Sequence, residues 1–157
     1  MSKSVKRVER AAEEFGLQIE VLRMGDSTRT AQDAANACNC AVGQIVKSLI
    51  FKGRVSGDLV LLLISGANQV DLEKAADVVG EPLDRADAAE VRARTGFAIG
   101  GLSPIGHLEA PRIWMDRDLE QFDQIWAAAG APDAVFATTP GDLLRVCGAT
   151  AVAITTR

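Results

Sequence analysis

Two apolar runs separated by a short polar turn constrain the fold of this chain more than any other feature. Residues 45–51 and 59–65 are both strand-sized and rich in branched aliphatic side chains, and residues 52–58 between them carry the glycines and charges of a turn. We therefore expect an antiparallel hairpin. Because both runs are nearly continuous in apolar residues, we expect the hairpin at the middle of a sheet covered on both faces.

Helices are predicted from apolar periodicity and from their end signals. Apolar residues recur at helical spacing from Val5 to Phe15, and Gly16 follows as a C-terminal stop. Thr30 with Asp33 has the form of a capping box, and Pro140 suits the first turn of a helix. Together these signals predict four or five helices, within residues 5–15, 30–38, 71–79, 87–95 and 139–147.

Further strands are predicted at residues 17–21, 112–115, 134–137 and 151–155. Residues 124–130 are ambiguous, since their alanines favour a helix whereas the following Gly-Ala-Pro-Asp turn favours a hairpin with 134–137; we predict the hairpin. The order of elements is mixed rather than strictly alternating. The chain is therefore expected to be an α/β protein of the α+β type, one domain over residues 1–157, with a central mixed or antiparallel sheet of six or seven strands.

Length, composition and charge exclude several classes. At 157 residues the chain has the size of one ordinary domain, and no run reaches the roughly 18 apolar residues of a membrane span. The charged N-terminus does not resemble a signal peptide, and three cysteines give no disulfide framework, so we expect a cytoplasmic protein. Three cysteines with one histidine also supply no evident set of metal ligands, and we expect neither a metal nor a cofactor. A net charge of −4 argues against a surface that binds long nucleic acid, DNA included, through many phosphates, but not against a partner that offers only its end.

A glycine-rich segment at residues 95–107, T-G-F-A-I-G-G-L-S-P-I-G-H, holds four of the fourteen glycines and the only histidine. Such a loop can direct backbone N–H groups at an anion or an ester carbonyl, although the same composition also describes an ordinary tight turn. The apolar residues 97–99 and 113–115 on either side favour the first interpretation, because they are expected to be two buried strands that deliver the loop.

Lys47 interrupts the first apolar run, on the strand face that it shares with Ile45, Leu49 and Phe51. A lysine on an apolar face is costly unless its stem lets the ammonium reach water or an anion meets it. Both interpretations are open. In the second, a partly desolvated ammonium with a lowered pKa awaits a carboxylate, a phosphate or a developing oxyanion.

Three other polar residues are weaker candidates. His107 closes the glycine loop and titrates near neutrality, but a lone histidine is more often structural. Asp142 is most simply a helix-start carboxylate, and Ser103 has no base near it in sequence. No G-x-S-x-G elbow, Walker loop, H-E-x-x-H motif or dinucleotide fingerprint is present.

Four segments taken together resemble the YbaK/EbsC family, the free-standing relatives of the editing insertion domain of bacterial prolyl-tRNA synthetases. They are I-V-K-S-L at 45–49, the glycine segment at 95–107, W-A-A-A-G at 126–130 and T-P-G-D-L at 139–143, in family order and spacing. The resemblance covers at least residues 30–157. It implies a compact α/β fold with a mixed sheet and hydrolysis in trans of the ester between a small mischarged amino acid (alanine, cysteine, serine or threonine) and its tRNA.

The resemblance also assigns roles to residues. Lys47 is expected to contact the terminal adenosine, and Gly101 is expected to be the backbone donor to the substrate carbonyl. His107 matches a histidine that lines the amino-acid pocket in some branches. The rest of the substrate site is expected among Met24, Thr30, Gly100, Leu102, Ser103 and Pro104. The expected partner is the acceptor end of an aminoacyl-tRNA, with an aminoacyl-tRNA synthetase as a second candidate. Two alternative functions stay open: a non-catalytic module that binds tRNA or nucleotide ends, and a hydrolase for another small ester or amide.

Overall fold

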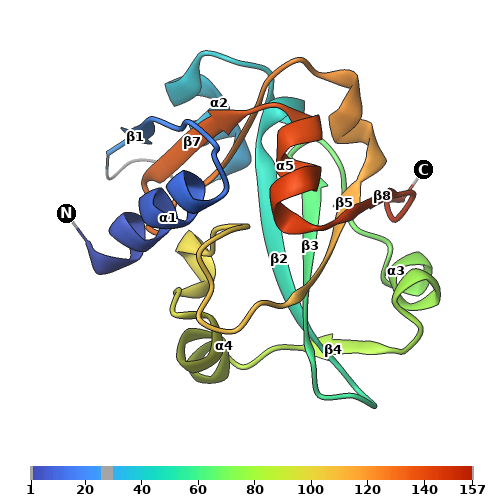
Figure 1. Ribbon diagram of the computed structural model, residues 1–157. Coiled ribbons are helices and arrows are strands. Elements are labelled where there is room, and N and C mark those ends of the chain that lie inside the picture. The colour runs from blue at the N-terminus through green and yellow to red at the C-terminus, as the bar shows by residue number, and fades with distance from the viewer. Residues whose placement is uncertain (1, 26–29, 157) are drawn as a thin grey trace.

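The computed structural model describes residues 2–25 and 30–156, and its largest layer is a five-stranded mixed sheet in the order β4-β2-β3-β5-β8 (Figure 1). Strands β2 and β3 pair antiparallel, as do β2 and β4, whereas β5 runs parallel to both β3 and β8. The α+β class and the mixed sheet predicted from the sequence are thus confirmed. The strand bounds are β2 Val46–Gly53, β3 Leu59–Ser65, β4 Leu83–Arg85, β5 Arg112–Asp116 and β8 Thr150–Val152.

The predicted hairpin lies at the centre of this sheet. Strands β2 and β3 pair from Val46 opposite Ser65 to Lys52 opposite Leu59, and every residue of β3 is buried. Alternate residues belong to two separate apolar clusters: Leu59, Leu61 and Leu63 to the larger one, and Val60, Leu62 and Ile64 to the smaller one. The two-sided burial that the continuous apolar run predicted is therefore present in β3.

A second, three-stranded antiparallel sheet consists of β1 (Val21–Arg23), β7 (Ala134–Thr138) and β6 (Ile125–Ala128). The prediction of a single sheet with six or seven strands was wrong in this respect, since the described residues form eight strands in two sheets. The hairpin prediction for β6 and β7 is confirmed. A parallel bridge between Ile45 and Trp126 links the two sheets, so the start of β2 lies beside β6.

Within the described part of the chain five α-helices cover the sheets, and the N-terminal caps of four of them follow the sequence signals. The Thr30–Asp33 capping box is formed, Asp71 and Asp87 cap the third and fourth helices, and Thr139 precedes Pro140 at the fifth. The helices are α1 Lys3–Glu14, α2 Ala31–Cys38, α3 Leu72–Val79, α4 Ala88–Thr95 and α5 Pro140–Cys147, and three short 3₁₀ turns are η1 Val42–Gln44, η2 Ile99–Gly101 and η3 Arg117–Gln121. No helix among residues 2–25 and 30–156 is long and apolar enough to span a bilayer.

Two local predictions differ from the structure, and one strand was missed. The strand expected at 17–21 starts only at Val21, where the chain first meets a partner strand opposite Phe136. The segment 97–99 is not a strand, because Phe97 is buried whereas Ile99 begins η2 and is 43% exposed. Strand β4 was not predicted, since its Leu-Asp-Arg sequence is too short and too polar to show a strand pattern.

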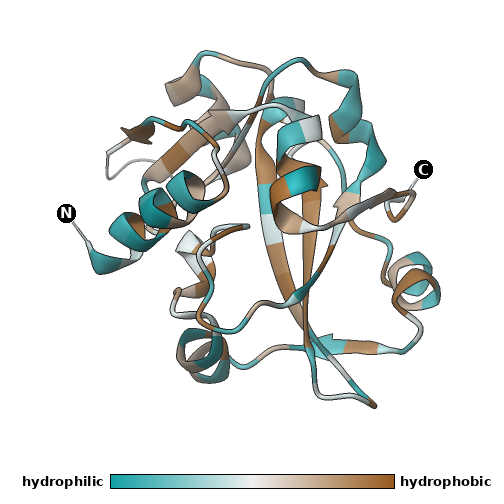
Figure 2. Cartoon of the chain, viewed as in Figure 1, coloured by the Kyte–Doolittle hydropathy of each residue, from teal (hydrophilic) through white to brown (hydrophobic). Residues whose placement is uncertain are grey.

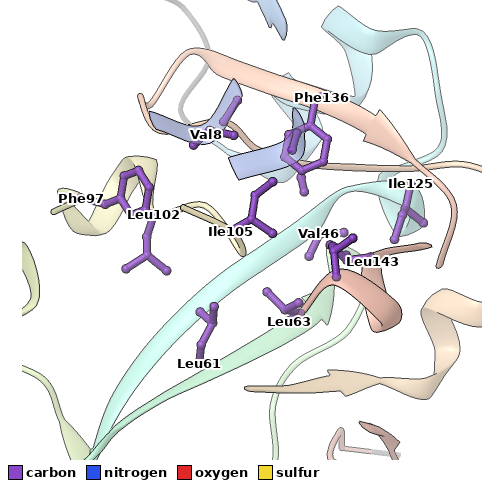
Figure 3. Close-up of a cluster of buried hydrophobic side chains, with 14 of the residues drawn as sticks. Val8, Val46, Leu61, Leu63, Phe97, Leu102, Ile105, Ile125, Phe136 and Leu143 are labelled. Atoms are coloured by element: carbon purple, nitrogen blue, oxygen red, sulfur yellow. The ribbon is translucent and has the colours of Figure 1, made fainter. Parts of the chain in front are cut away.

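The glycine segment is anchored in the main core. Phe97, Leu102 and Ile105 are almost fully buried, and Figure 3 shows Ile105 between Phe136 of β7 and the β2–β3 hairpin. Apolar colour in Figure 2 concentrates on β2 and β3, whereas much of the outer surface of α1 is hydrophilic. Burial of these three side chains attaches the glycine segment to the core on both sides of η2.

Candidate functional site

A cavity of about 180 Å³ lies where the start of β2, helix α2, the β6–β7 hairpin and η2 meet. Five of the residues predicted for the substrate site line it, although they come from four separate parts of the sequence. These are Met24, Thr30, Lys47, Gly100 and Leu102. The cavity also has walls that the sequence did not single out, among them Ser48, Trp126, Ala128 and Pro132.

Lys47 is partly buried in this cavity, and its ammonium donates a hydrogen bond to the backbone carbonyl of Asn68. Burial lowers the pKa of Lys47, and the nearby Asp116 carboxylate opposes part of that shift. The lowered pKa is the direction expected for a partly desolvated ammonium. Because an ammonium has three N–H donors, the bond to Asn68 leaves donors for a ligand.

Asp116 organises the backbone beneath Lys47. The residue is 1% exposed, and its carboxylate accepts hydrogen bonds from the Ser65 N–H at 3.1 Å, the Asn68 Nδ2 at 2.9 Å and the Asp118 N–H at 2.9 Å. Asn68 Nδ2 also donates to Asp118 Oδ2 at 2.9 Å. This network was not predicted from the sequence, because its members lie at or just after the ends of two strands, β3 and β5, and only the parallel pairing of these strands brings them together.

The two central glycines of the loop have different surroundings. Gly100 lines the cavity, and a Cβ there would have Pro132 Cγ as its nearest neighbour at 3.8 Å. Gly101 is buried against the next turn, where a Cβ would lie 2.8 Å from Ala131 Cα. The Gly101 N–H donates to Ala98 O at 3.0 Å as part of η2. The Gly101 N–H, which was expected to bind the substrate carbonyl, therefore already has an acceptor in Ala98. Close packing against Ala131 explains why a glycine stands at this position.

Two polar atoms beside the cavity have no hydrogen-bond partner in the described structure. They are the Ser48 hydroxyl and the Trp126 indole N–H, and both residues line the cavity wall. Buried polar atoms of this kind are uncommon and call for a specific explanation. Ser48 follows Lys47 directly, so its position on β2 was visible in the sequence, whereas the approach of Trp126 depends on the bridge between the sheets.

The remaining predicted residues do not line this cavity. Pro104 and His107 line a separate cavity of about 290 Å³ between α1, the end of the loop and α5. Ser103 is fully buried, and its hydroxyl accepts from the Ile105 N–H at 3.3 Å. Asp142 lies in the first turn of α5, 3.4 Å from Arg145. The loop thus faces Lys47 at its start and a different space at its end.

His107 is a neutral, packed side chain at pH 7. Burial lowers its pKa to about 4, with a contribution from nearby Arg7, while a hydrogen bond to the Ser103 backbone acts in the opposite direction. The imidazole meets the Phe97 ring edge-on at a centroid distance of 5.6 Å. Its Nε2 is buried and has no partner among the described residues.

The chain belongs to the aminoacyl-tRNA editing domain family, whose model matches residues 26–146. The resemblance to YbaK/EbsC proteins is thereby confirmed. Among solved structures, one described as a candidate trans-editing enzyme for prolyl tRNA synthetase has 44% sequence identity and a TM-score of 0.94, and the match covers 100% of this chain and 99% of that one.

Two curated relatives are similar over most of their length. The uncharacterized protein YwhH of Bacillus subtilis is 28% identical over 141 residues, which are 89% of this chain and 88% of YwhH. A protein of Enterococcus faecalis, EbsC, named as a candidate Cys-tRNA(Pro)/Cys-tRNA(Cys) deacylase, is 27% identical over 126 residues, which are 74% of this chain and 76% of EbsC. A proline–tRNA ligase of Thermosipho africanus is 36% identical over 81 residues, only 14% of its own length.

Proposed function

We propose that this protein is a trans-editing deacylase that hydrolyses the ester of a small mischarged amino acid on tRNA. The observation that carries the proposal is the convergence of Lys47 and Gly100 on one small cavity beside the unpartnered polar atoms of Ser48 and Trp126. Family membership and the deacylase and editing names of relatives support the same reaction.

In this proposal Lys47 holds the 3′-terminal nucleotide. Its ammonium is fixed by Asn68, which the Asp116 carboxylate fixes in turn, so the charge is oriented before the substrate arrives. A preorganised ammonium lowers the entropic cost of binding an anionic or hydroxyl-rich group such as the terminal adenosine. Ser48 and Trp126 form part of the cavity wall against which the aminoacyl group would pack.

The chemical step needs little from the protein, because an aminoacyl ester is already activated. The oxygen of a water molecule bonds to the ester carbonyl carbon, and the bond between that carbon and the ribose oxygen breaks. A proton of the water passes to the ribose oxygen, which yields the free amino acid and a tRNA hydroxyl. A backbone N–H at the carbonyl oxygen stabilises the developing oxyanion, and such a donor contributes about 10²–10³ in rate. Because the Gly101 N–H already donates to the Ala98 carbonyl, we assign the role of oxyanion donor to the Gly100 N–H. The neighbouring ribose hydroxyl of the substrate helps to orient the water.

The size of the cavity bears on the amino acid. A space of about 180 Å³, walled by Met24, Ala34 and Ala128, suits side chains of the alanine, cysteine, serine or threonine class. One methylene in such a pocket is worth about 1–3 kcal/mol of discrimination, so neighbouring members of this class are separated only moderately.

The experiment is release of labelled amino acid from a panel of mischarged tRNAs, with wild type, Lys47→Met and Lys52→Met in parallel. Lys52 lies on the same strand and pairs with Glu90 at 3.0 Å outside the cavity, so it is a matched control for the same substitution. We expect release of one or two small amino acids, a loss of about a hundredfold in Lys47→Met and near-normal rates in Lys52→Met.

Three outcomes would contradict the proposal in different ways. Tight tRNA binding without any loss of the ester would instead indicate the non-catalytic binding module. Equal release from charged tRNA and from simple amino-acid esters would indicate a general esterase. Full activity in a folded Lys47→Met variant would retain the reaction but remove Lys47 from the site.

A further inference from the structure

Helix α1 carries a row of cations that the proposed active site does not use. Lys3, Lys6, Arg7 and Arg10 have the i, i+3, i+4, i+7 spacing that places side chains along one strip of a helix. Arg7 is committed to the fold, since it donates to the carbonyls of Gly96 and Gly106 at 2.7 Å each. Lys3, Lys6 and Arg10 are exposed, and among the described residues their side chains make no hydrogen bond or ion pair. We call these three residues the basic stripe.

The basic stripe is not explained by the stability of α1. A helix favours acidic side chains near its N-terminus and basic ones near its C-terminus. Helices α2, α3, α4 and α5 follow this rule with an acidic residue in the first turn, whereas α1 has none there and no basic residue in its last turn. In α1 the order is reversed, with Lys3 and Lys6 early and Glu13 and Glu14 late.

Elsewhere the chain neutralises many of its cations. Arg23, Lys52, Arg54, Arg94, Arg112 and Arg145 each form an ion pair with a carboxylate. In a protein of net charge −4, three adjacent unpaired cations on one helix form a local positive field within a negative surround. This field would attract a polyanion to α1 in particular.

The basic stripe begins close to the cavity. The first turn of α1 packs against Gly130, where a Cβ would lie only 2.7 Å from the carbonyl oxygen of Ser4. The same turn of the β6–β7 hairpin carries Pro132, which lines the cavity with Gly100. One hairpin turn therefore separates the start of the stripe from the wall of the proposed active site, and Figure 1 shows α1 lying along β7.

We propose that the basic stripe binds the phosphate backbone of the tRNA acceptor stem while the 3′ end occupies the Lys47 cavity. This inference rests on the proposed function, because it names where the body of that substrate lies. Lysine and arginine neutralise phosphates without reading sequence, so the stripe positions the RNA rather than selecting it. An anionic lipid surface fits less well, since the apolar face of α1, with Val5, Val8 and Ala12, is buried in the core and cannot insert.

The test compares Lys3→Gln/Lys6→Gln with Arg85→Gln/Arg92→Gln, which removes the same charge from exposed positions on β4 and α4. Binding of uncharged tRNA is measured over a series of salt concentrations. Because the α1 variant neutralises two fewer phosphates, we expect the slope of log affinity against log salt to flatten by about 1.5 and the affinity at about 0.1 M salt to fall about tenfold or more. The control pair is expected to retain the wild-type slope.

A second readout separates binding of the stem from a structural effect. We expect Lys3→Gln/Lys6→Gln to release amino acid more slowly from charged tRNA at low concentration, but at the wild-type rate from an aminoacylated adenosine, and to unfold no more easily than wild type. An unchanged salt slope, an equal loss in the control pair, or a loss of binding to phosphatidylglycerol vesicles with tRNA binding intact would overturn the inference.

The two proposals fail in distinguishable ways. If wild-type protein releases no amino acid from any charged tRNA, the deacylase function is rejected, and the salt series still decides whether the basic stripe binds the RNA. If release is normal and Lys3→Gln/Lys6→Gln behaves as wild type on charged tRNA, only the assignment of the stripe is rejected.

Discussion

Replacing Gly101 by alanine tests how the glycine loop is held against the β6–β7 hairpin. The added Cβ would lie 2.8 Å from Ala131 Cα and 2.9 Å from Ala131 N, and all of its nearest neighbours are backbone atoms. Backbone cannot rotate away as the end of a side chain can, so either the loop or the hairpin turn must move. Gly100→Ala is the matched control, because the same methyl group one residue earlier meets only Pro132 Cγ at 3.8 Å.

The expected cost follows from the packing. Inserting one carbon into a well-packed site typically costs about 1–3 kcal/mol, and the backbone contacts at Gly101 place this substitution in the upper half of that range. At Gly100 an alanine makes ordinary contact and reduces the freedom of the unfolded chain, so the free energy of unfolding should stay within about 1 kcal/mol of wild type. Neither glycine has a positive φ, so steric contact alone separates the two variants.

Urea unfolding monitored by tryptophan fluorescence measures both free energies, with equal m-values as the check that the unfolded states are comparable. We expect Gly101→Ala to unfold at lower urea and to lose deacylase activity, because displacement of Ala131 also moves the Pro132 wall of the cavity. The reasoning is refuted if the two variants have the same free energy of unfolding, or if Gly100→Ala is the less stable one.

Two further predictions concern titrating groups. The pKa of His107 is lowered to about 4, so between pH 6.5 and 4 the unfolded chain takes up a proton that the folded chain does not. The free energy of unfolding should therefore fall by about 3 kcal/mol on acidification. Urea unfolding at pH 7 and pH 4.5 measures this fall, which should be smaller in His107→Gln. If Lys47 acts as a cation, activity falls as the pH rises through its lowered pKa. Asp116→Asn removes the carboxylate that opposes the lowering, so it should move the alkaline limb of the pH profile to lower pH. The same variant should cost about 2 kcal/mol of stability, because it disturbs the hydrogen bonds from the Ser65 and Asp118 N–H groups. Rates of ester loss, corrected for spontaneous hydrolysis, and urea unfolding check the second prediction, and an alkaline limb that is identical in wild type and Asp116→Asn contradicts it.

The sequence was most informative where the deciding interactions are local. The Thr30–Asp33 capping box and the Asp71, Asp87 and Thr139 caps each depend on hydrogen bonds that span two or three residues. The β2–β3 hairpin was predicted from two neighbouring apolar runs with a turn between them. Such signals need no knowledge of the rest of the fold.

The candidate site was predictable only in part. Lys47 and the glycine loop with Gly100 and Leu102 were candidates from the sequence pattern, and Met24 and Thr30 came from a resemblance to a family. The structure places all five around one cavity, although their roles stay predictions. Ser48, Trp126 and Asp116 were not predicted, since nothing in their local sequence distinguishes a cavity wall or a buried network from an ordinary strand residue.

By itself the sequence determined the helices with their caps, the central hairpin and the family, because spacing and capping act over a few residues and the family motifs are contiguous. Only the tertiary structure decided that the β6–β7 hairpin forms a second sheet, that Gly101 serves close packing, and that His107 faces a different cavity from Lys47. Each of these depends on which surfaces of distant segments fill the same space. Two glycines adjacent in sequence are chemically identical, and only the neighbour that packs against each one tells a cavity wall from a backbone contact.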